Sequence, residues 1–337
     1  MISPYFWGQN LFGAEKSYFH HYSSLRRIRY DFRFYTDFRF IKEEILNLIN
    51  VLRIPKEMRT PQGLKFLGAE GFCILLRRLA YPNRLLDLQP IFGRREEELS
   101  HIFNTVLDYI YDNFRWLTES WKQWWLQVDH LKAYSDAITA KGSALQTCFG
   151  FIDGTLHATC RPTRHQQEVY SGHKRQHGLK YQSVVLPNGL IANLYGPVSG
   201  RRHDSYMLAE SNLMWNLQNH LGAENLHLYG DKGYALQQHL ITPYQGNDLP
   251  PQHRQFNLVI SRMRICVEWE FGELFEQFAF LDLKKNQKIY LQPLGKYMAV
   301  ATILKNCKTC LNGSQTSMYF GLNPPSLSSY VNNDPNL

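Results

Sequence analysis

Residues 148–155 read CFGFIDGT, an apolar run that ends in an acidic residue and a glycine. The run Cys148 to Ile152 is short and continuously apolar, which predicts a buried strand. Asp153 then stands at the strand end, beside Gly154, and a glycine lets a backbone or a ligand come close. The stretch therefore predicts a carboxylate on a rigid central strand, where a metal ligand is held best.

Two further acidic residues have related settings. Asp231 lies in YGDKGY (229–234), directly after a predicted strand, and Glu268 lies in the helical pattern VEWEFG (267–272). Hard oxygen ligands of this kind suit Mg²⁺ or Mn²⁺. Asp153, Asp231 and Glu268 are thus the predicted catalytic and metal-binding residues of a site with two divalent ions, which could cut a phosphodiester bond. Gly154 and Gly233 are expected to leave room for a nucleic-acid backbone.

Glu270 competes with Glu268 for the third position. Two residues along a helix differ by about 200°, so both cannot face one site. Arg264 lies one turn before Glu268 and Gly272 one turn after it, which favours Glu268. Arg264 is expected to pair with Glu268 or with a phosphate.

A fourth acidic residue, Asp204, lies in GRRHDS (200–205) at the start of a predicted helix. Two roles stay open for it. Its carboxylate could cap the helix through free backbone N–H groups, or it could support the metal ligands.

The region 147–312 has the pattern of an α/β domain. Apolar runs predict five strands, the second and third joined as a hairpin around Pro187-Asn188-Gly189. The order strand, hairpin, helix, strand, strand, helix is that of an RNase H-like domain with a mixed five-stranded sheet and flanking helices. The strands are predicted at 148–152, 181–186, 190–195, 226–229 and 241–244, the helices at 205–216 and 262–278, a boundary at 137–146 and a C-terminal tail at 313–337.

The region 42–136 is predicted to be a helical domain. Three helices with tight turns before residue 114 resemble a helix-turn-helix unit. In such a unit Arg94 and Arg95, at the start of the last helix, would contact DNA. The alternative is that these helices only support packing. Four tryptophans, at 116, 121, 124 and 125, are expected in the core. Residues 1–41 are predicted to form a basic aromatic arm, because aromatics and charges alternate over 25–40; the arm either covers a core edge or binds phosphate.

The formal net charge of +8 favours a polyanionic partner, with nucleic acid as the leading candidate. Basic residues and histidines surround the acidic motifs, which predicts phosphate binding; a solvated face is the alternative, and zinc binding by His173 and His177 lacks further ligands. The segment comprises Arg161, Arg164, His165, His173, Lys174, Arg175, His177, Lys180, Arg201, Arg202 and His203.

The six cysteines are scattered, which argues against a disulfide framework of the small secreted type. Cys307 and Cys310 form one CxxC pair without a second pair, so they are expected to pack in the core. No apolar run approaches the roughly 18 residues of a membrane span. These features predict a soluble intracellular protein.

Five motifs together resemble the PIF/Harbinger transposases. They are FIDGT (151–155), GHKRQHGLKYQ (172–182), GPVSGRRHDS (196–205), GDKGY (230–234) and RxxVExxFG (264–272). Their order and number make the resemblance specific, and it extends over roughly residues 70–310. Phe275 departs from the family, which often has a basic residue at that position.

The resemblance implies a DDE-type nuclease that hydrolyses phosphodiester bonds at transposon ends and joins the 3′ hydroxyl to target DNA. It implies the triad Asp153, Asp231 and Glu268 and places Asp204 on a further acidic position of the pattern. It also implies a Myb-like DNA-binding partner, a homo-oligomer and a nuclear protein, which without its partner could stay in the cytoplasm. The alternatives are a domesticated DNA-binding or partner-recruiting protein, and another RNase H-like nuclease acting on RNA or junctions.

Overall fold

The computed structural model describes residues 33–332, which form two compact units. The first unit holds the described residues up to Asn113 together with Gln277–Leu283. The second holds Phe114–Glu276 and the described residues from Lys284 onward. The division between the units therefore lies earlier in the chain than the predicted boundary at 137–146.

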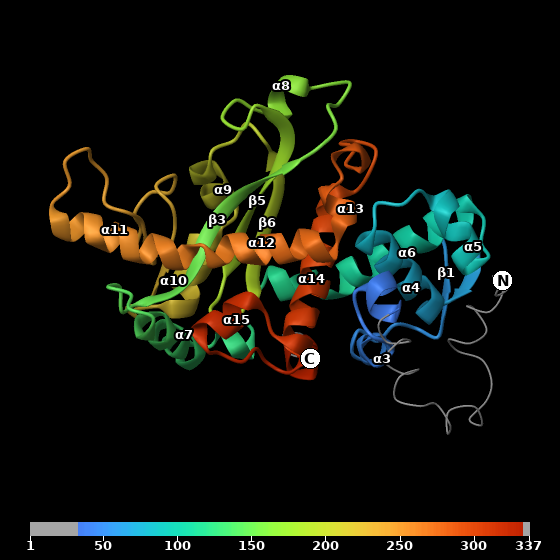
Figure 1. The fold of residues 1–337 in the computed structure, drawn as a ribbon, viewed down its shortest axis with the longest axis horizontal. Helices are drawn as coiled ribbons and strands as arrows, with labels where there is room; N and C mark the ends of the chain where they lie inside the picture. Colours follow the sequence, from blue (N-terminus) through green and yellow to red (C-terminus); the bar gives the residue numbers. More distant parts are fainter. Residues whose placement is uncertain (1–32, 333–337) are drawn as a thin grey trace. The chain divides into compact units, whose positions relative to one another are not determined.

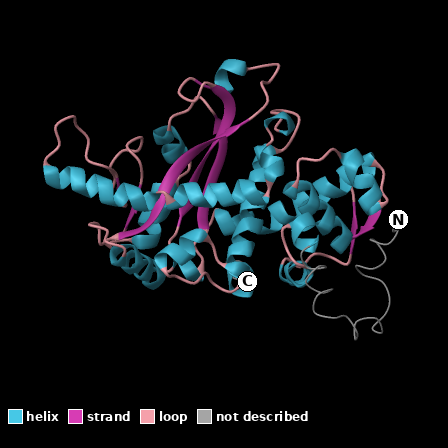
Figure 2. Cartoon of the chain, in the orientation of Figure 1, coloured by secondary structure: helices cyan, strands magenta, loops and turns pink. Residues whose placement is uncertain are grey.

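The first unit consists mainly of helices, with one small antiparallel strand pair (Figures 1 and 2). In its longest helix, apolar residues at helical spacing, among them Leu99, Val106 and Ile110, are fully buried, which explains why this segment is an amphipathic helix. The elements are α3 (Lys42–Val51), β1 (Glu57–Arg59), β2 (Lys65–Leu67), α4 (Gly68–Ala80), the 3₁₀ turn η2 (Leu85–Leu88), α5 (Gln89–Phe92), α6 (Glu96–Phe114) and α13 (Ala279–Asp282). That these helices form a DNA-binding helix-turn-helix domain stays a prediction.

The segment α13 completes the core of this unit although it comes from far along the chain. It packs against α4, and its Phe280 is 1% exposed. The Phe280 ring lies 4.6 Å from the Arg78 guanidinium and 6.4 Å from the Phe103 ring. Arg39 also donates a hydrogen bond to the Gln277 carbonyl, at 3.2 Å.

The predicted extended arm is wrong for its described part. Residues 33–38 are helical, and Phe34 and Phe38 are buried with their rings 5.6 Å apart. A spacing of four residues satisfies both a period of two and a period of 3.6, so the alternation did not distinguish strand from helix. Residues 1–32 lie outside the described residues.

A mixed six-stranded sheet forms the centre of the second unit. The strand order is β4-β5-β3-β7-β8, with β6 also pairing with β5. Strands β3, β7 and β8 are parallel and the other pairs are antiparallel. The five predicted strands are present, and β4 is a two-residue addition. The strands are β3 (Cys148–Ala158), β4 (Tyr170–Ser171), β5 (Gln176–Val185), β6 (Ile191–Ser199), β7 (His227–Tyr229) and β8 (Leu240–Ile241).

Helices cover both faces of this sheet (Figure 1). On one face, Phe320 stacks on Phe151 and Phe275 on His157; on the other, Met207 lies against Gly154. A mixed sheet with flanking helices is compatible with an RNase H-like DDE domain. The helices are α7 (Val128–Ala140), α8 (Gln166–Val169), α9 (Asp204–Glu210), α10 (Leu213–Leu221), α11 (Pro251–Arg264), α12 (Cys266–Gln277), α14 (Leu294–Asn312), α15 (Gln315–Phe320) and α16 (Leu327–Val331).

The predicted C-terminal tail is wrong over residues 313–332, which belong to the core of the second unit. Tyr330 is fully buried, with its ring 5.9 Å from that of Trp125. Trp121 packs edge-on against Phe149 of the central strand, at 6.5 Å. The tryptophan-rich segment therefore supports the sheet, which is why the second unit begins near residue 114. Residues 333–337 lie outside the described residues.

None of the helices within residues 33–332 is long and apolar enough to span a membrane. The six cysteines form no disulfide, and Cys307 is buried, as the packing prediction requires.

Candidate active site

Asp153 and Asp231 lie at the same level of two adjacent parallel strands. Phe151 of β3 is in register with Tyr229 of β7, and each aspartate follows two residues later. The predicted strand end at Asp153 is wrong, because β3 continues to Ala158. Strand β7 ends at Tyr229, so Asp231 lies just beyond that end, beside the middle of β3. Burial raises the pKa of Asp153, and the nearby carboxylate of Asp231 adds to this shift.

The structure adds Asp204 to this pair. A Cβ on Gly154 would meet the Asp204 Cγ at 2.8 Å, and one on Gly233 would lie 3.0 Å from an oxygen of Asp231 and 3.3 Å from one of Asp204. The two glycines thus accommodate protein carboxylates. We had expected them to leave room for a nucleic-acid backbone, and for Gly154 that space holds Asp204.

The capping role considered for Asp204 is wrong. His203 occupies the N-cap position of α9, no side chain caps the helix, and Asp204 is its first residue. The Asp204 carboxylate instead accepts a hydrogen bond from the Lys180 Nζ, at 2.9 Å, with both side chains less than one-fifth exposed. Lys180 therefore neutralises a carboxylate of the site in this structure.

Arg264 pairs with Asp153, and not with Glu268 as the sequence suggested. Its Nη1 donates to the Asp153 Oδ2 at 2.8 Å, and both side chains are 22% exposed. Burial by itself lowers the pKa of Arg264, but the carboxylates of Asp153, Asp231 and Glu268 raise it above its ordinary value. All three predicted carboxylates therefore lie within electrostatic range of one guanidinium.

Glu268 lies in the first turn of α12 and is exposed. The helix runs along β3, because Arg264 contacts Asp153 and Phe275 stacks on His157 at 5.3 Å. Glu268 lies between those two contacts and about one turn from Arg264, on the same side of the helix. Glu270 is fully buried on the opposite side of the helix. That Glu268 is the third metal ligand stays a prediction.

The pKa shifts at the site are those expected where several carboxylates lie close together. Burial raises the pKa of Asp153, Arg264 opposes this shift, and Asp231 adds to it. Burial also raises the pKa of the Tyr234 phenol well above its usual value, with contributions from Asp204, Asp153 and Asp231. A bound cation would relieve this repulsion.

Within the part of the chain that is described, no group of three or more His, Cys, Asp and Glu residues is arranged to hold a metal ion. In this structure Arg264 is paired with Asp153 and Lys180 with Asp204. The donors themselves, oxygens of three aspartates and one glutamate, have the chemistry that Mg²⁺ and Mn²⁺ require. The residues therefore fit a divalent cation that displaces the two basic side chains.

The predicted DNA-contacting arginines at the start of α6 differ from each other. Arg94 makes a two-pronged ion pair with Glu70, with both distances 2.9 Å, so its charge is already matched within the protein. Arg95 is 80% exposed and has only a long 3.9 Å pair with Glu98. Arg95 alone presents its charge to solvent.

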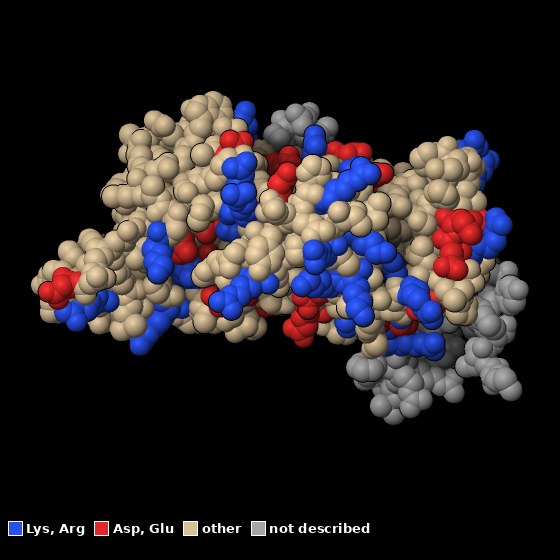
Figure 3. Space-filling model, turned by 90° about the horizontal axis from the view of Figure 1, so that it is seen from above, with Lys and Arg blue, Asp and Glu red and all other residues tan. Residues whose placement is uncertain are grey.

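The predicted basic segment gathers at the far end of β3 and β5. Arg161, Arg164, His173, Lys174, Arg175, Arg201 and Arg202 are exposed, and Arg202 lies over the Tyr206 ring at 4.3 Å. Figure 3 shows how lysine and arginine side chains gather in groups on one face of the molecule.

Lys284 and Lys285, which the sequence analysis did not single out, join this basic end. Cys160 is hydrogen-bonded to the backbone of residues 285 and 287, which brings that segment beside Arg161. Burial first, and then the charges of Arg161 and Lys284, lower the pKa of His177. The signal in the sequence was the pair KK itself, but its position beside β3 required the fold.

Residues 152–306 match the family model described as DDE superfamily endonuclease. The matched segment begins one residue before Asp153 and includes Asp204, Asp231 and Glu268. It covers less than half of the chain, and it supports a DDE-transposase-like family with nuclease activity on DNA. Neither the curated proteins nor the solved structures yielded a match.

Proposed function

We propose that this protein is a metal-dependent DNA endonuclease of the PIF/Harbinger type, which cuts phosphodiester bonds at transposon ends and joins the freed 3′ hydroxyl to target DNA. One observation carries the proposal: Asp153 within β3 and Asp231 just after the end of β7 lie at the same level of two adjacent parallel strands, inside the segment that matches the DDE endonucleases. The five sequence motifs support the PIF/Harbinger subtype.

The side chains divide the work at the site. Asp153, Asp231 and Glu268 would hold the divalent ions, and Asp204 would support them through its position beside Gly154 and Gly233. When bound, a pair of such ions supplies an activated nucleophile and stabilises the attacking and leaving oxygens. In this structure Arg264 forms an ion pair with Asp153, and its planar guanidinium is also suited to bind a phosphate.

The basic end of the sheet provides a surface for DNA. Eight residues of extended chain separate Asp153 from Arg161, which corresponds to about 26 Å. At 3.4 Å per base pair, that distance equals roughly eight base pairs of duplex. A duplex cut at the carboxylates would therefore reach the exposed Arg161, Lys284 and Lys285. We also propose a Myb-like partner, self-association and action in the nucleus, on the strength of the motifs alone.

A domesticated protein without required nuclease activity is the second candidate. Phe275, where related sequences often carry a basic residue, is used for packing: its ring stacks on the buried His157 and lies 6.2 Å from Phe271. This position contributes no charge to a phosphate. A chain that keeps its cellular role after loss of the carboxylates would belong to this class.

Cleavage of DNA by the purified protein tests the proposal. The substrate is a supercoiled plasmid carrying the DNA that flanks the gene, with Mg²⁺ or Mn²⁺ and, in a second series, the Myb-like partner. Asp153→Asn, Asp231→Asn and Glu268→Gln are each expected to lower cleavage by at least about 10²-fold, because the ligands act as a unit. Asp248→Asn, at a fully exposed aspartate, should cut normally. Absence of cleavage by the unmodified protein, or equal cleavage by Asp153→Asn, contradicts the proposal.

A further inference from the structure

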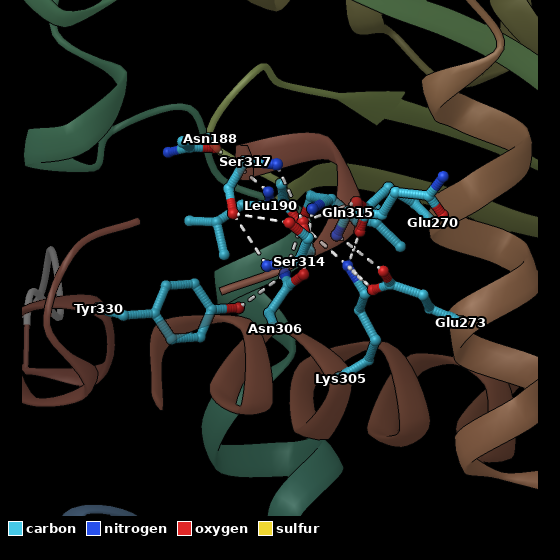
Figure 4. A network of polar contacts seen from close by, with 12 residues as sticks. Asn188, Leu190, Glu270, Glu273, Lys305, Asn306, Ser314, Gln315, Ser317 and Tyr330 are labelled. Carbon is cyan, nitrogen blue, oxygen red and sulfur yellow. Dashed lines mark hydrogen bonds and ion pairs between the residues drawn. The ribbon is translucent and has the colours of Figure 1, made fainter. Parts of the chain in front are cut away.

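Lys305 of α14 is a fully buried cation outside the candidate active site. Its ammonium forms an ion pair with Glu270, lies 3.8 Å from the Glu273 Oε2 and donates a 3.0 Å hydrogen bond to the Gly189 carbonyl (Figure 4). Burial lowers the pKa of this lysine. A charged group that is buried away from water is stable only when ion pairs and hydrogen bonds replace its hydration. The buried ammonium of Lys305 therefore depends on these contacts.

Both carboxylates that meet Lys305 belong to α12, the helix that carries Glu268. Further contacts hold them in place: the Ser314 hydroxyl donates to the Glu270 Oε1 at 3.1 Å, and the Gln315 backbone N–H donates to the Glu273 Oε1 at 2.9 Å. Glu270 is about 200° around the helix from Glu268. Whatever fixes Glu270 on the inner side therefore fixes the direction of Glu268 on the outer side.

The other partners of this network belong to the sheet. Gly189 lies in the β5–β6 turn with φ +82°, and a Cβ there would collide with the Ser314 hydroxyl. Asn306, next to Lys305, exchanges two hydrogen bonds with the backbone of Ile191 in β6, at 3.0 and 2.9 Å. Helix α14 is thus fastened to the sheet that also carries Asp153, and Lys305 extends this attachment to α12.

We propose that Lys305 is a positioning residue: through Glu270 it fixes the rotation of α12 against the sheet, so that Glu268 faces Asp153 and Asp231. The proposal rests on the proposed function, in which Glu268 is a metal ligand. The rest of the inner side of α12 is apolar, with Val267, Phe271 and Leu274 buried. Apolar packing alone tolerates small rotations, whereas a charged pair has one satisfied arrangement.

Replacing Lys305 and Glu270 together by neutral residues distinguishes an effect on the orientation of Glu268 from an effect on the stability of the fold. The double variant Lys305→Met/Glu270→Leu keeps the volume and removes both charges of the fully buried pair, while Glu273, which is 22% exposed, keeps its hydrogen bond from the Gln315 N–H. Its unfolding temperature should therefore stay close to that of the unmodified protein. Titration with Mn²⁺ alone should show an affinity about tenfold lower, the size expected when a residue that orients a ligand is lost. Affinity for duplex DNA should not change.

A double-mutant cycle then shows whether Lys305 acts through Glu268. Glu268→Gln lowers Mn²⁺ affinity directly, and adding Lys305→Met/Glu270→Leu to it should cause no further loss. Tyr330→Phe is the matched control, because it removes a hydrogen bond to Asn306 in the same network and leaves Lys305, Glu270 and Glu273 unchanged. The Mn²⁺ affinity of this variant should equal that of the unmodified protein.

The outcomes are distinct. Unchanged Mn²⁺ affinity in the folded double variant, or a loss that adds to that of Glu268→Gln, overturns the positioning role. If the variant does not fold, Lys305→Gln/Glu270→Gln enters the same cycle under the same criteria. A failure of the proposed function shows instead as absence of DNA cleavage by the unmodified protein, which the Mn²⁺ titration does not measure.

Discussion

At the scale of residues, the candidate site is formed by pairs of side chains of opposite charge. Asp153 is paired with Arg264 and Asp204 with Lys180, so two of the four carboxylates of the site have a basic partner. Lys180 and Arg264 are recognisable in the sequence as basic residues, but the sequence does not show which carboxylate each of them pairs with. Lys180 is 24 residues from Asp204 and Arg264 is 111 residues from Asp153, so only the fold brings them together.

The glycine beside Asp153 allows a test of this arrangement. In Gly154→Ala the new Cβ would lie 2.8 Å from the Asp204 Cγ and 2.9 Å from the Met207 Cε, so the carboxylate has to move. We expect a loss of about 1–3 kcal/mol in the free energy of unfolding, as for other overpacked sites. Denaturant unfolding measures the loss, and Mn²⁺ titration should show weaker binding.

Gly272→Ala is the matched control for that variant. Gly272 lies in α12 with nothing within 4 Å of an added Cβ. Alanine there should leave the protein as stable or stabilise it by up to about 1 kcal/mol, because alanine favours a helix. If Gly154→Ala were as stable as Gly272→Ala, Asp204 would not be held against β3 as described.

At the scale of elements, the apolar patterns predicted the central strands and the hairpin. They did not predict where helices end. The helix expected at 205–216 is interrupted at Asn212, whose φ is +52°, and the one expected at 262–278 is divided at Ile265. Neither interruption contains a proline or a glycine, the strongest helix breakers, although asparagine adopts the left-handed conformation more readily than most residues.

The strand β7 makes the stability of the second unit sensitive to pH. Burial and the neighbouring His239 lower the pKa of His227 from 6.5. The unfolded chain therefore binds the proton more tightly, so this contribution is fully present above pH 6.5 and is lost as the pH falls below it. We expect the unfolding temperature to decrease from pH 7 to pH 5.

In the variant His227→Gln the unfolding temperature should decrease less between pH 7 and pH 5 than in the unmodified protein. His203→Gln, which changes an exposed histidine, should keep the slope of the unmodified protein. The measurement is thermal unfolding followed by circular dichroism at fixed ionic strength. Equal slopes in both variants would contradict the role of His227.

At the scale of the molecule, the mixed sheet with flanking helices of the second unit, which is compatible with an RNase H-like domain, was predictable from the order of strands and helices in the sequence. The composition of the first unit was not, because α13 is separated from its neighbours by the whole α/β segment. Four apolar residues near position 280 looked like the end of the helix 262–278. Their actual partners, Arg78 and Phe103, lie in α4 and α6.

Phe280→Ala tests this dependence. Removing a large buried side chain should lower the free energy of unfolding of the first unit by about 3–5 kcal/mol. Hydrogen exchange should therefore accelerate in α4 and α6, while the amides of β3 keep their protection. Equal acceleration in both units would show that they unfold together and not separately.

The position of α13 also has a consequence for synthesis on the ribosome. Domains generally fold in order of emergence, the N-terminal one first. Here the N-terminal unit has to wait, because Phe280 emerges only after most of the second unit has left the exit tunnel. Until then α4 and α6 expose the apolar surface that Phe280 later covers, and this nascent chain is a natural client for a chaperone.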